Sequence, residues 1–328
     1  MKSAVVYAVK KLLIFFAGIF VLSIIVFVMS RIAPGDPLVS YYGDRAEKMS
    51  ASEKAAARER LGLDSSVYIQ YIRWVGNAAR GNFGISYKYR QDVSEVISRR
   101  LGNTLMLGGI SFALVFILAL LLGWFCARFE DRLPDRILCK TGTFVSCIPE
   151  FWLSLVLIFV FAVTLGVLPG GGAYDPGHSG DALNRLRHLV LPVAVLVMSH
   201  FWYYAYPVRN MLLEQTHADY VLTAKAKGMS SGAVMLKHCI PNIIPSYISF
   251  MAVSVPHILS GTYIVEAVFS YPGLGTLAYE SARYGDYNLL MVICLLTGTA
   301  VILSNMTGQA IMEKINPAIS AQKRGENL

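Results

Sequence analysis

Charged residues are scarce in this chain of 328 residues. Asp, Glu, Lys and Arg together make up 15% of it, whereas hydrophobic residues make up 55%. Ordinary soluble domains carry about a quarter charged residues. The shortage of charge excludes an ordinary water-soluble domain and indicates that the bilayer is the solvent of this protein.

Motifs for nucleotide binding and catalysis are also missing. No G-x-x-x-x-G-K-[ST] loop occurs, so the chain lacks the usual means of holding ATP phosphates. Catalytic patterns such as His-Glu-x-x-His and Gly-x-Ser-x-Gly are absent as well. We therefore expect a non-catalytic chain without a cofactor of its own.

The chain has only five cysteines, and none of them falls in a predicted outer loop. No C-x-x-C or Cys/His spacing suggests a metal site, and disulfides are not expected. The net charge of +8 is not gathered into a Lys/Arg block with interleaved aromatic residues, which argues against nucleic acid as a partner.

Six uncharged stretches are present, and a bilayer core needs about 20 apolar residues per helix. Such continuous runs lack the alternation of barrel strands, so the predicted fold is an all-α membrane protein with six transmembrane helices in one bundle. The stretches are Leu12–Ser30, Leu101–Ala127, Phe151–Leu168, Leu189–Val208, Ile240–Val265 and Tyr287–Met312.

Lys and Arg in the short loops predict the orientation. With a cytoplasmic N-terminus, most of them fall in inner segments, and both termini are then cytoplasmic. The first span follows Lys10 and Lys11 and could be mistaken for a secretory signal. Its apolar run is longer than a signal core and has no small-x-small cleavage site, so we interpret it as an uncleaved membrane helix.

The segments between the spans differ in character. In the first outer segment, Ser50 and Glu53 form a capping box for a short helix that Gly62 ends, and the tyrosines and tryptophan that follow favour a small folded cap on the membrane surface. Arg128–Lys140 is predicted to be a short charged inner loop, and Pro169–Gly177 an irregular outer loop.

The segment from Glu214 to Pro241 is too polar for a span and predicts a helix-turn-helix. Asp219 is the expected N-cap of its first helix, and Gly228 the expected stop. Ser230 or Ser231 begins a second short helix that is expected to end before Pro241.

This segment resembles the coupling loop of binding-protein-dependent ABC importer permeases, in the dipeptide, oligopeptide and nickel transport family. The family pattern is approximately Asp-Tyr-Val-x-Thr-Ala-x-Ala-Lys-Gly. The resemblance implies a helix that docks into a groove on the ATPase subunit, with small residues where the two surfaces come close. The residues that match are Asp219, Tyr220, Val221, Thr223, Ala224, Ala226, Lys227 and Gly228.

The resemblance covers nearly the whole chain. It includes the Arg31-x-x-Pro34-Gly35-Asp36-Pro37 exit from the first span, a cap with Leu61 and Gly62, and the run Glu266–Gly275. The chain departs from the pattern at 284–288 and at 316–318. The implied domains are an N-terminal membrane helix at 1–32, a cap at 33–100, a core permease domain at 101–313 that contains the coupling loop 214–241, and a tail at 314–328.

The resemblance also implies the partners and the location. They are a second homologous permease, two cytoplasmic ATPase subunits that bind ATP and magnesium, an extracytoplasmic binding protein and the lipid of a bacterial or archaeal inner membrane. Peptides are the expected cargo, with nickel or a metal chelate as the alternative. A secondary transporter or a membrane enzyme would be a different class, but neither inverted repeats nor a catalytic set is present.

Ionisable residues at membrane depth have two interpretations. His200, His257 and Glu266 could line the translocation path, since such groups are costly in lipid and often functional. Alternatively, the histidines are neutral and hydrogen-bonded between helices, and Glu266, like Glu150, caps a span or bonds to loop amides.

Overall fold

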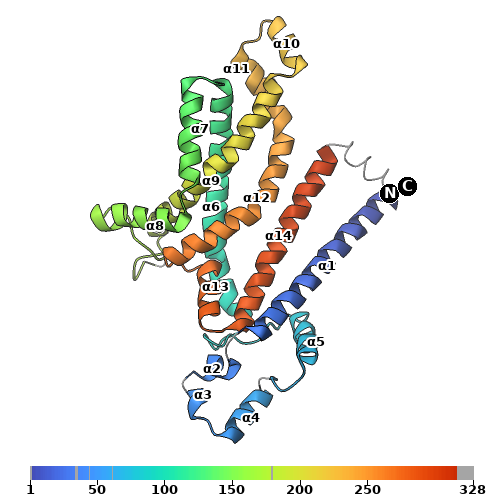
Figure 1. Cartoon of the computed structure of the whole chain (residues 1–328), viewed down its shortest axis with the longest axis vertical. Helices are drawn as coiled ribbons and strands as arrows, with labels where there is room; N and C mark the ends of the chain where they lie inside the picture. Colours follow the sequence, from blue (N-terminus) through green and yellow to red (C-terminus); the bar gives the residue numbers. More distant parts are fainter. Residues whose placement is uncertain (1, 34–35, 44, 61, 179, 316–328) are drawn as a thin grey trace. The chain divides into compact units, whose positions relative to one another are not determined.

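The computed structural model describes residues 2–33, 36–43, 45–60, 62–178 and 180–315, and within them the only β-type pairing is an isolated bridge between Ile85 and Asp92 (Figure 1). The prediction of an all-helical fold is confirmed. Pro34, Gly35, Leu61 and the tail from Asn316 onward lie outside the described residues. The helices are α1 (Lys2–Ile32), α2 (Pro37–Tyr42), α3 (Arg45–Lys48), α4 (Ala51–Arg60), α5 (Val67–Ala78), α6 (Val93–Arg128), α7 (Leu133–Ser146), α8 (Glu150–Leu157), η1 (Ile158–Thr164, π-helical), α9 (Ala182–Thr216), α10 (Asp219–Ala226), α11 (Ser231–Val234), η2 (Met235–Cys239, π-helical), α12 (Ile240–Val268), α13 (Leu274–Arg283) and α14 (Tyr287–Ile315).

The chain folds into two compact units. The first contains the residues up to Thr104 together with Pro272–Leu303, and the second contains Leu105–Tyr271 together with the residues from Ser304 onward. α6 and α14 therefore contribute to both. The domain boundaries expected from the sequence follow the succession of membrane spans, whereas these units follow the packing of the chain.

In the first unit, α1 packs closely against α14 at two glycines. A Cβ at Gly18 would lie 3.2 Å from Ile302 Cδ1, and one at Gly298 would overlap the Leu22 side chain. Association of helices in a bilayer depends on close packing, which small residues permit. The two glycines thus allow α1 and α14 to approach each other.

The cap after α1 consists of the four short helices α2 to α5. The predicted capping box is confirmed at α4, where the Ser50 N–H donates to Glu53 Oε2 (2.8 Å) and the Glu53 N–H donates to Ser50 Oγ (3.3 Å). α4 ends at Arg60, and Gly62 has φ +69°, a backbone conformation that favours glycine. Local sequence signals therefore determine where this helix begins and ends.

The loop before α6 is fastened to the segment around α13 in the same unit. Ser86 Oγ donates to Asp286 Oδ2. Lys88 Nζ and Tyr89 OH both donate to Glu280 Oε2, at 2.6 and 2.5 Å. These contacts join segments about 200 residues apart in the sequence and give the first unit its polar core.

Five helices among the described residues are long and apolar enough to cross a membrane: Val9–Ile32, Val93–Arg128, Ala182–Thr216, Ser231–Val268 and Tyr287–Lys314. The third predicted span differs from them. Leu133–Ser146 and Glu150–Thr164 are long and apolar enough only when they are taken together, and they are bent by 95° at the break between them. The described chain thus has five spans, or six if this bent pair counts as one.

The prediction of a loop from Arg128 to Lys140 is wrong in part, because α7 begins at Leu133. Pro134 lies in the first turn of α7, where its missing N–H breaks no helical hydrogen bond. Pro149 is the N-cap of α8. Pro134 therefore marks the start of α7 and Pro149 the start of α8. The charged residues of α7 led to the prediction of a loop in its place.

The core of the second unit lies between α6, α9 and α12. It contains Phe116, Tyr204 and Tyr247, and Tyr247 OH donates to the Phe116 carbonyl oxygen at 2.5 Å. α9 continues through Pro192 and Pro207, as α12 does through Pro245 and Pro256. Prolines are tolerated in membrane helices where neighbouring groups satisfy the freed carbonyls.

The predicted irregular loop at Pro169–Gly177 is confirmed, since η1 ends at Thr164 and α9 begins only at Ala182. The buried His188 of α9 holds this loop in place. Its Nδ1 lies 2.9 Å from the Gly171 carbonyl oxygen, and its Nε2 lies 3.3 Å from Asp175 Oδ1.

Candidate functional site

The polar segment between α9 and α12 forms a pair of short helices, α10 and α11, which lie beyond the ends of α9 and α12 (Figure 1). Gly228 lies in the turn between them with φ +81°. The Gly228 N–H donates to the Lys225 carbonyl (2.9 Å) and the Met229 N–H to the Ala224 carbonyl (3.2 Å). These bonds satisfy the last carbonyls of α10, as expected of a glycine-terminated helix.

Two details of the predicted helix-turn-helix are corrected. The N-cap of α10 is Ala218, and Asp219 is the first helical residue, where its negative charge still favours the helix N-terminus. Ser230 is the N-cap of α11, as predicted, since its Oγ accepts from the Ala233 N–H at 3.3 Å. The second helix does not stop before Pro241, because η2 carries it directly into α12. Pro241 lies in the first turn of α12.

The candidate coupling residues divide into an inward and an outward set. Val221 and Ala224 are buried against Val234, Met235 and Cys239 in the core of the second unit. Tyr220 is half-buried, and its OH donates to Gln215 Oε1 at 2.9 Å. The exposed side chains of this surface are Asp219, Leu222, Thr223, Lys225, Ala226 and Lys227.

Ala224 therefore does not face outward, as close approach to another protein would require. It lets α10 pack on α11, whereas Ala226 stays exposed. Leu222 is 67% exposed, although it is a large apolar side chain. The helix pair thus presents a rigid surface with one apolar residue among charged ones.

A polar pocket of about 290 Å³ lies at the base of the helix pair. Arg128, Arg132 and Lys225 line it, and His217 Nε2 lies 3.6 Å from Glu130 Oε2 at its edge. The pocket joins the end of α6 to α10 and α11. Basic groups therefore surround the point where the helix pair meets the long helices.

A cluster of polar residues around the buried His200 lies between α8, α9 and α12 in the second unit. His200 is 1% exposed, with its Nδ1 2.9 Å from the Leu196 carbonyl oxygen and its Nε2 3.5 Å from Glu150 Oε1. The His200 and His257 rings are 4.8 Å apart, and His257 Nδ1 lies 2.9 Å from Tyr204 OH.

Glycine at position 261 leaves room for this cluster. A Cβ there would lie 2.6 Å from Glu150 Oε1 and 2.8 Å from His200 Cε1. Contacts under 3.0 Å essentially never occur for real Cβ atoms, so the carboxylate and the imidazole occupy space that any other residue would fill.

The three candidate path residues therefore have different environments. The structure brings His200 and His257 together, with His200 buried and His257 exposed beside Tyr203. Glu266 is fully buried near the end of α12, and its carbonyl oxygen accepts from the Tyr271 N–H at 2.9 Å. Of the three, His257 alone faces outward from this chain.

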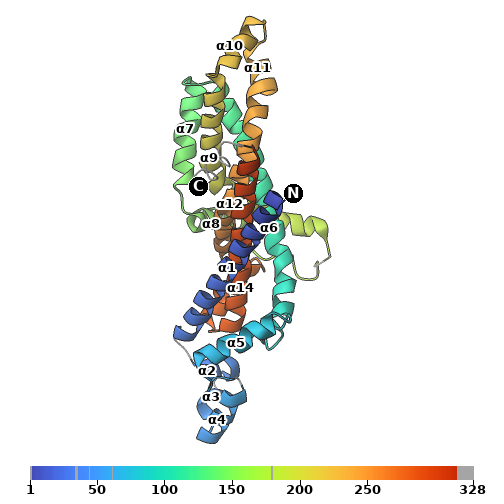
Figure 2. The same cartoon turned by 90° about the vertical axis from the view of Figure 1, so that its right-hand side faces the viewer.

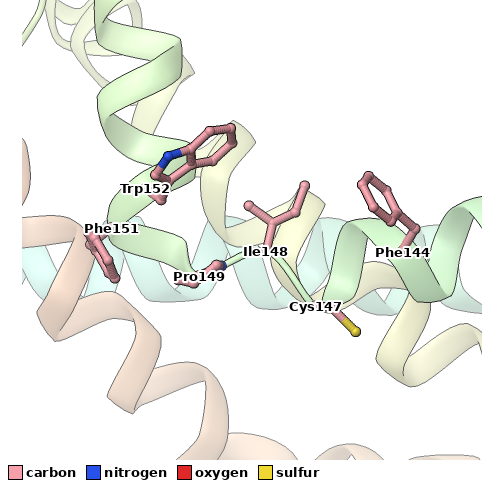
Figure 3. A pocket seen from close by; sticks show the side chains of 6 residues that line it. All are labelled: Phe144, Cys147, Ile148, Pro149, Phe151 and Trp152. Atoms are coloured by element: carbon pink, nitrogen blue, oxygen red, sulfur yellow. The ribbon is translucent and has the colours of Figure 1, made fainter.

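An apolar hollow of about 340 Å³ lies at the break between α7 and α8 (Figure 3). It is lined by Phe144, Cys147, Ile148, Pro149, Phe151 and Trp152. None of these six side chains is charged.

Two family descriptions match this chain. Residues 119–321 match the inner membrane component of binding-protein-dependent transport systems, and residues 5–108 match the N-terminal part of such membrane components. The chain belongs to this family. The family resemblance found in the sequence is thereby confirmed.

Several related proteins match almost end to end. The oligopeptide transport system permease protein AppB of Bacillus subtilis is 30% identical over 314 residues, which are 95% of this chain and 98% of that protein. A putative peptide permease protein of Brucella ovis is 31% identical with the same coverage. The glutathione transport system permease protein GsiC of Escherichia coli K12 is 32% identical over 319 residues, again 95% and 98% of the two chains.

Among solved structures, the inward-facing MetNI methionine ABC transporter is similar with a TM-score of 0.55 and 17% identity. The match covers 68% of this chain and 97% of that one, and it shows the shared fold. This chain is thus a multi-pass permease subunit of an ABC importer in the inner membrane. It is non-catalytic, because ATPase and substrate-binding partners complete such systems.

Sequence reasoning missed two parts of this permease. Glu150 was considered as a residue at the end of a span, but its contact with His200 and the space that Gly261 leaves for the two were not foreseen. The ion pair between Asp135 of α7 and Arg209 of α9 was also missed: Arg209 Nη2 and Nε donate to the two carboxylate oxygens at 2.6 and 2.8 Å. The available signal was charge in the segments that border the spans, where an unpaired charge is costly.

Proposed function

We propose that this permease forms half of a translocation path for peptides that an extracytoplasmic binding protein delivers. The other half comes from a second homologous permease, because five or six spans make a thin bundle for a peptide-sized path. The similar proteins named for oligopeptide and peptide transport support this cargo class over nickel or a metal chelate.

The observation that carries the proposal is the exposed helix pair α10–α11. Its turn is fixed by Gly228 and by backbone hydrogen bonds, and its inner face is packed into the core, so it moves together with α9 and α12. Asp219, Thr223, Ala226 and Lys227 face outward, and Leu222 adds an apolar contact. Such a surface suits a groove on an ATPase subunit.

In this arrangement each of the two permeases contacts one of two ATPase subunits, which bind ATP and magnesium. The coupling surface then faces the cytoplasm, as do both termini. The basic residues around the helix pair support this orientation, because Lys and Arg are enriched in cytoplasmic loops. A closing movement of the ATPases would reach α9 and α12 through α10 and α11.

We assign His257 to the wall of the translocation path, together with Tyr203. Both side chains are exposed on this chain, and the Tyr203 and His257 rings are 4.9 Å apart. They offer an aromatic face and imidazole hydrogen bonds to a peptide. His200 and Glu266 are buried, so we place them behind this wall and out of contact with the peptide.

The test is ATP-driven uptake by the complete complex in liposomes, with a binding protein and labelled peptides of different lengths. We expect uptake that requires both the ATPases and the second permease. Uptake driven by an ion gradient without ATPases would indicate a secondary transporter. Transport by a complex with this chain as its only membrane subunit would contradict the pairing, and uptake of a nickel chelate instead of peptides would contradict the cargo.

A further inference from the structure

Helix α5 of the cap has an unusually apolar exterior. Its 12 residues contain a single charged side chain, Arg73, and none of them is buried. The exposed apolar residues are Val67 (49%), Tyr68 (72%), Ile69 (43%), Ile72 (50%) and Val75 (36%). A helix with one such face is stable where that face is removed from water.

The other face of α5 packs on the first membrane span. Tyr71 OH lies 2.8 Å from Ser23 Oγ of α1, and the Tyr71 ring makes an edge contact with the Phe27 ring at 5.2 Å. The Trp74 ring lies 6.2 Å from the Phe27 ring. Both views of the molecule show α5 beside the C-terminal half of α1, and all these residues belong to the first unit (Figures 1 and 2).

These contacts lie well inside the apolar part of α1. The candidate span runs to Ile32, and its last charged residue is Arg31, which marks the polar boundary of the bilayer. Ser23 precedes Arg31 by eight residues, or about 12 Å along a helix axis, and Phe27 precedes it by about 6 Å. A helix that contacts α1 at these positions lies below the headgroup level.

The C-terminal half of α1 also has exposed apolar side chains. Ile25 and Met29 of α1 are 49% and 66% exposed. The single charge of α5 need not oppose insertion, because Arg73 Nη1 donates to Ser65 Oγ (3.2 Å) just before the helix, and a long side chain can extend to the polar boundary. Bilayer lipid therefore fits this surface better than a water-soluble partner.

We propose that α5 is an interfacial membrane helix, with Tyr68, Ile69, Ile72 and Val75 in contact with the acyl chains of the leaflet at the C-terminal end of α1. α5 thereby anchors the cap in the bilayer in addition to the spans α1 and α6 at its two ends. This assignment does not depend on the cargo or on the ATPase contact.

The proposal is tested by spin labels on the complete complex in liposomes. A nitroxide is attached at Ile72→Cys in a chain whose five native cysteines are replaced by serine. Collisions with dissolved oxygen, which concentrates in lipid, are compared with collisions with a water-soluble nickel chelate. Matched labels are placed at Glu59 on α4 and at Phe20, an exposed apolar residue of α1 (55%).

We expect the label at Ile72 to resemble that at Phe20, with several-fold fewer nickel collisions than at Glu59. Equal nickel access at Ile72 and Glu59 would overturn the proposal. Protection of Ile72 only after the binding protein is added would also overturn it, because the face would then serve a protein partner. A second label at Tyr68, and ATP-driven uptake by each labelled complex, ensure that a folded protein is measured.

Discussion

The Glu150 carboxylate and the His200 imidazole face each other across α8 and α9, with Oε1 3.5 Å from Nε2. Because His200 Nδ1 is directed at the Leu196 carbonyl oxygen (2.9 Å), the neutral ring presents the lone pair of Nε2 to the carboxylate. A hydrogen bond between the two groups then requires a proton that they share. Neither Glu150 Oε2 nor His200 Nε2 has a hydrogen-bond partner among the described residues. The pair thus connects the start of α8, directly after the 95° break, to the core helix α9.

Gly261→Ala tests whether the Glu150–His200 pair depends on the space that Gly261 of α12 leaves open. The new Cβ would lie 2.6 Å from Glu150 Oε1 and 2.8 Å from His200 Cε1, so the carboxylate and the imidazole must both shift. Overpacking of this kind costs about 1–3 kcal/mol. We expect a lower thermal midpoint in detergent and reduced ATP-driven uptake.

The matched control is Gly109→Ala in α6, where a Cβ would meet nothing within 4 Å. Alanine favours a helix over glycine by about 1 kcal/mol, so this control should be neutral or stabilising. Adding Glu150→Ala to Gly261→Ala should recover part of the loss, which a double-mutant cycle would measure. Equal thermal midpoints for Gly261→Ala and Gly109→Ala would contradict the role of Gly261.

The parts of the structure that were predicted from the sequence depend on neighbours in the chain. Ser50 and Glu53 are three residues apart, and Gly228 ends α10 through bonds to Lys225 and Ala224. Such contacts follow from residue type and spacing. Even here the prediction placed the N-cap at Asp219 instead of Ala218, because it relied on a side chain that can cap a helix, whereas Ala218 has none.

The parts that were not predicted depend on residues far apart. Asp135 and Arg209 are 74 residues apart, and each alone looks like an ordinary charge beside a span. The break before Glu150 and the continuation of α11 into α12 through η2 also depend on packing, which overrides the local preference of a proline or a polar run. The family resemblance supplied the coupling function, but not which of its residues face inward.

The Asp135–Arg209 pair should behave as a buried ion pair. Asp135 is 1% exposed and accepts two hydrogen bonds from the guanidinium. Removing one partner of such a pair leaves a buried charge alone and costs about 3–5 kcal/mol. We expect Asp135→Ala and Arg209→Ala each to lower the free energy of unfolding in detergent by about that much.

The double variant Asp135→Asn/Arg209→Gln should lose less than Asp135→Ala, because no unpaired charge remains. Arg99→Ala provides the exposed comparison, since Arg99 pairs with Glu95 (2.6 Å) where both side chains are at least half exposed. Exposed pairs of this kind contribute about 0–1 kcal/mol. Additive losses in the Asp135→Ala/Arg209→Ala double variant would show that the two groups act independently.

The lowered pKa of Glu280 predicts that the protein loses stability in acid. Burial alone would raise the pKa of Glu280, but hydrogen bonds from Lys88 and Tyr89 outweigh it and lower the pKa below its usual value. A lowered pKa stabilises the folded state at pH above the unfolded value of about 4.3. This contribution is lost as the pH falls from there through the pKa of the folded state.

Thermal midpoints of the wild type and Glu280→Gln, measured from pH 7 to pH 3.5, check this prediction. We expect the wild type to be more stable at pH 7 and the difference to shrink below about pH 4.3. Glu59→Gln, at an exposed site on α4, should match the wild type throughout. A difference that stays constant over the whole range would mean that Glu280 does not act through its charge.

Gly228 offers the sharpest test of the proposed coupling, because a substitution there can strain the backbone without a clash between the new side chain and its neighbours. No atom lies within 4 Å of a Cβ built there, so the positive φ is the only obstacle to a side chain. A β-branched residue strains that conformation, whereas Asn tolerates it. We expect Gly228→Val to lose most peptide uptake while keeping ATP hydrolysis, and Gly228→Asn to keep both.

Gly232→Val serves as the matched control, since a Cβ at Gly232 also meets nothing within 4 Å and its φ is not positive. This variant should stay close to the wild type in uptake and in substrate-stimulated ATPase activity. Strain confined to the turn would tilt α10 against α11 and displace Leu222 and Ala226, although the membrane spans stay folded. Wild-type uptake and ATPase activity in Gly228→Val, measured side by side in the same liposomes, would show that the turn does not transmit the ATPase movement.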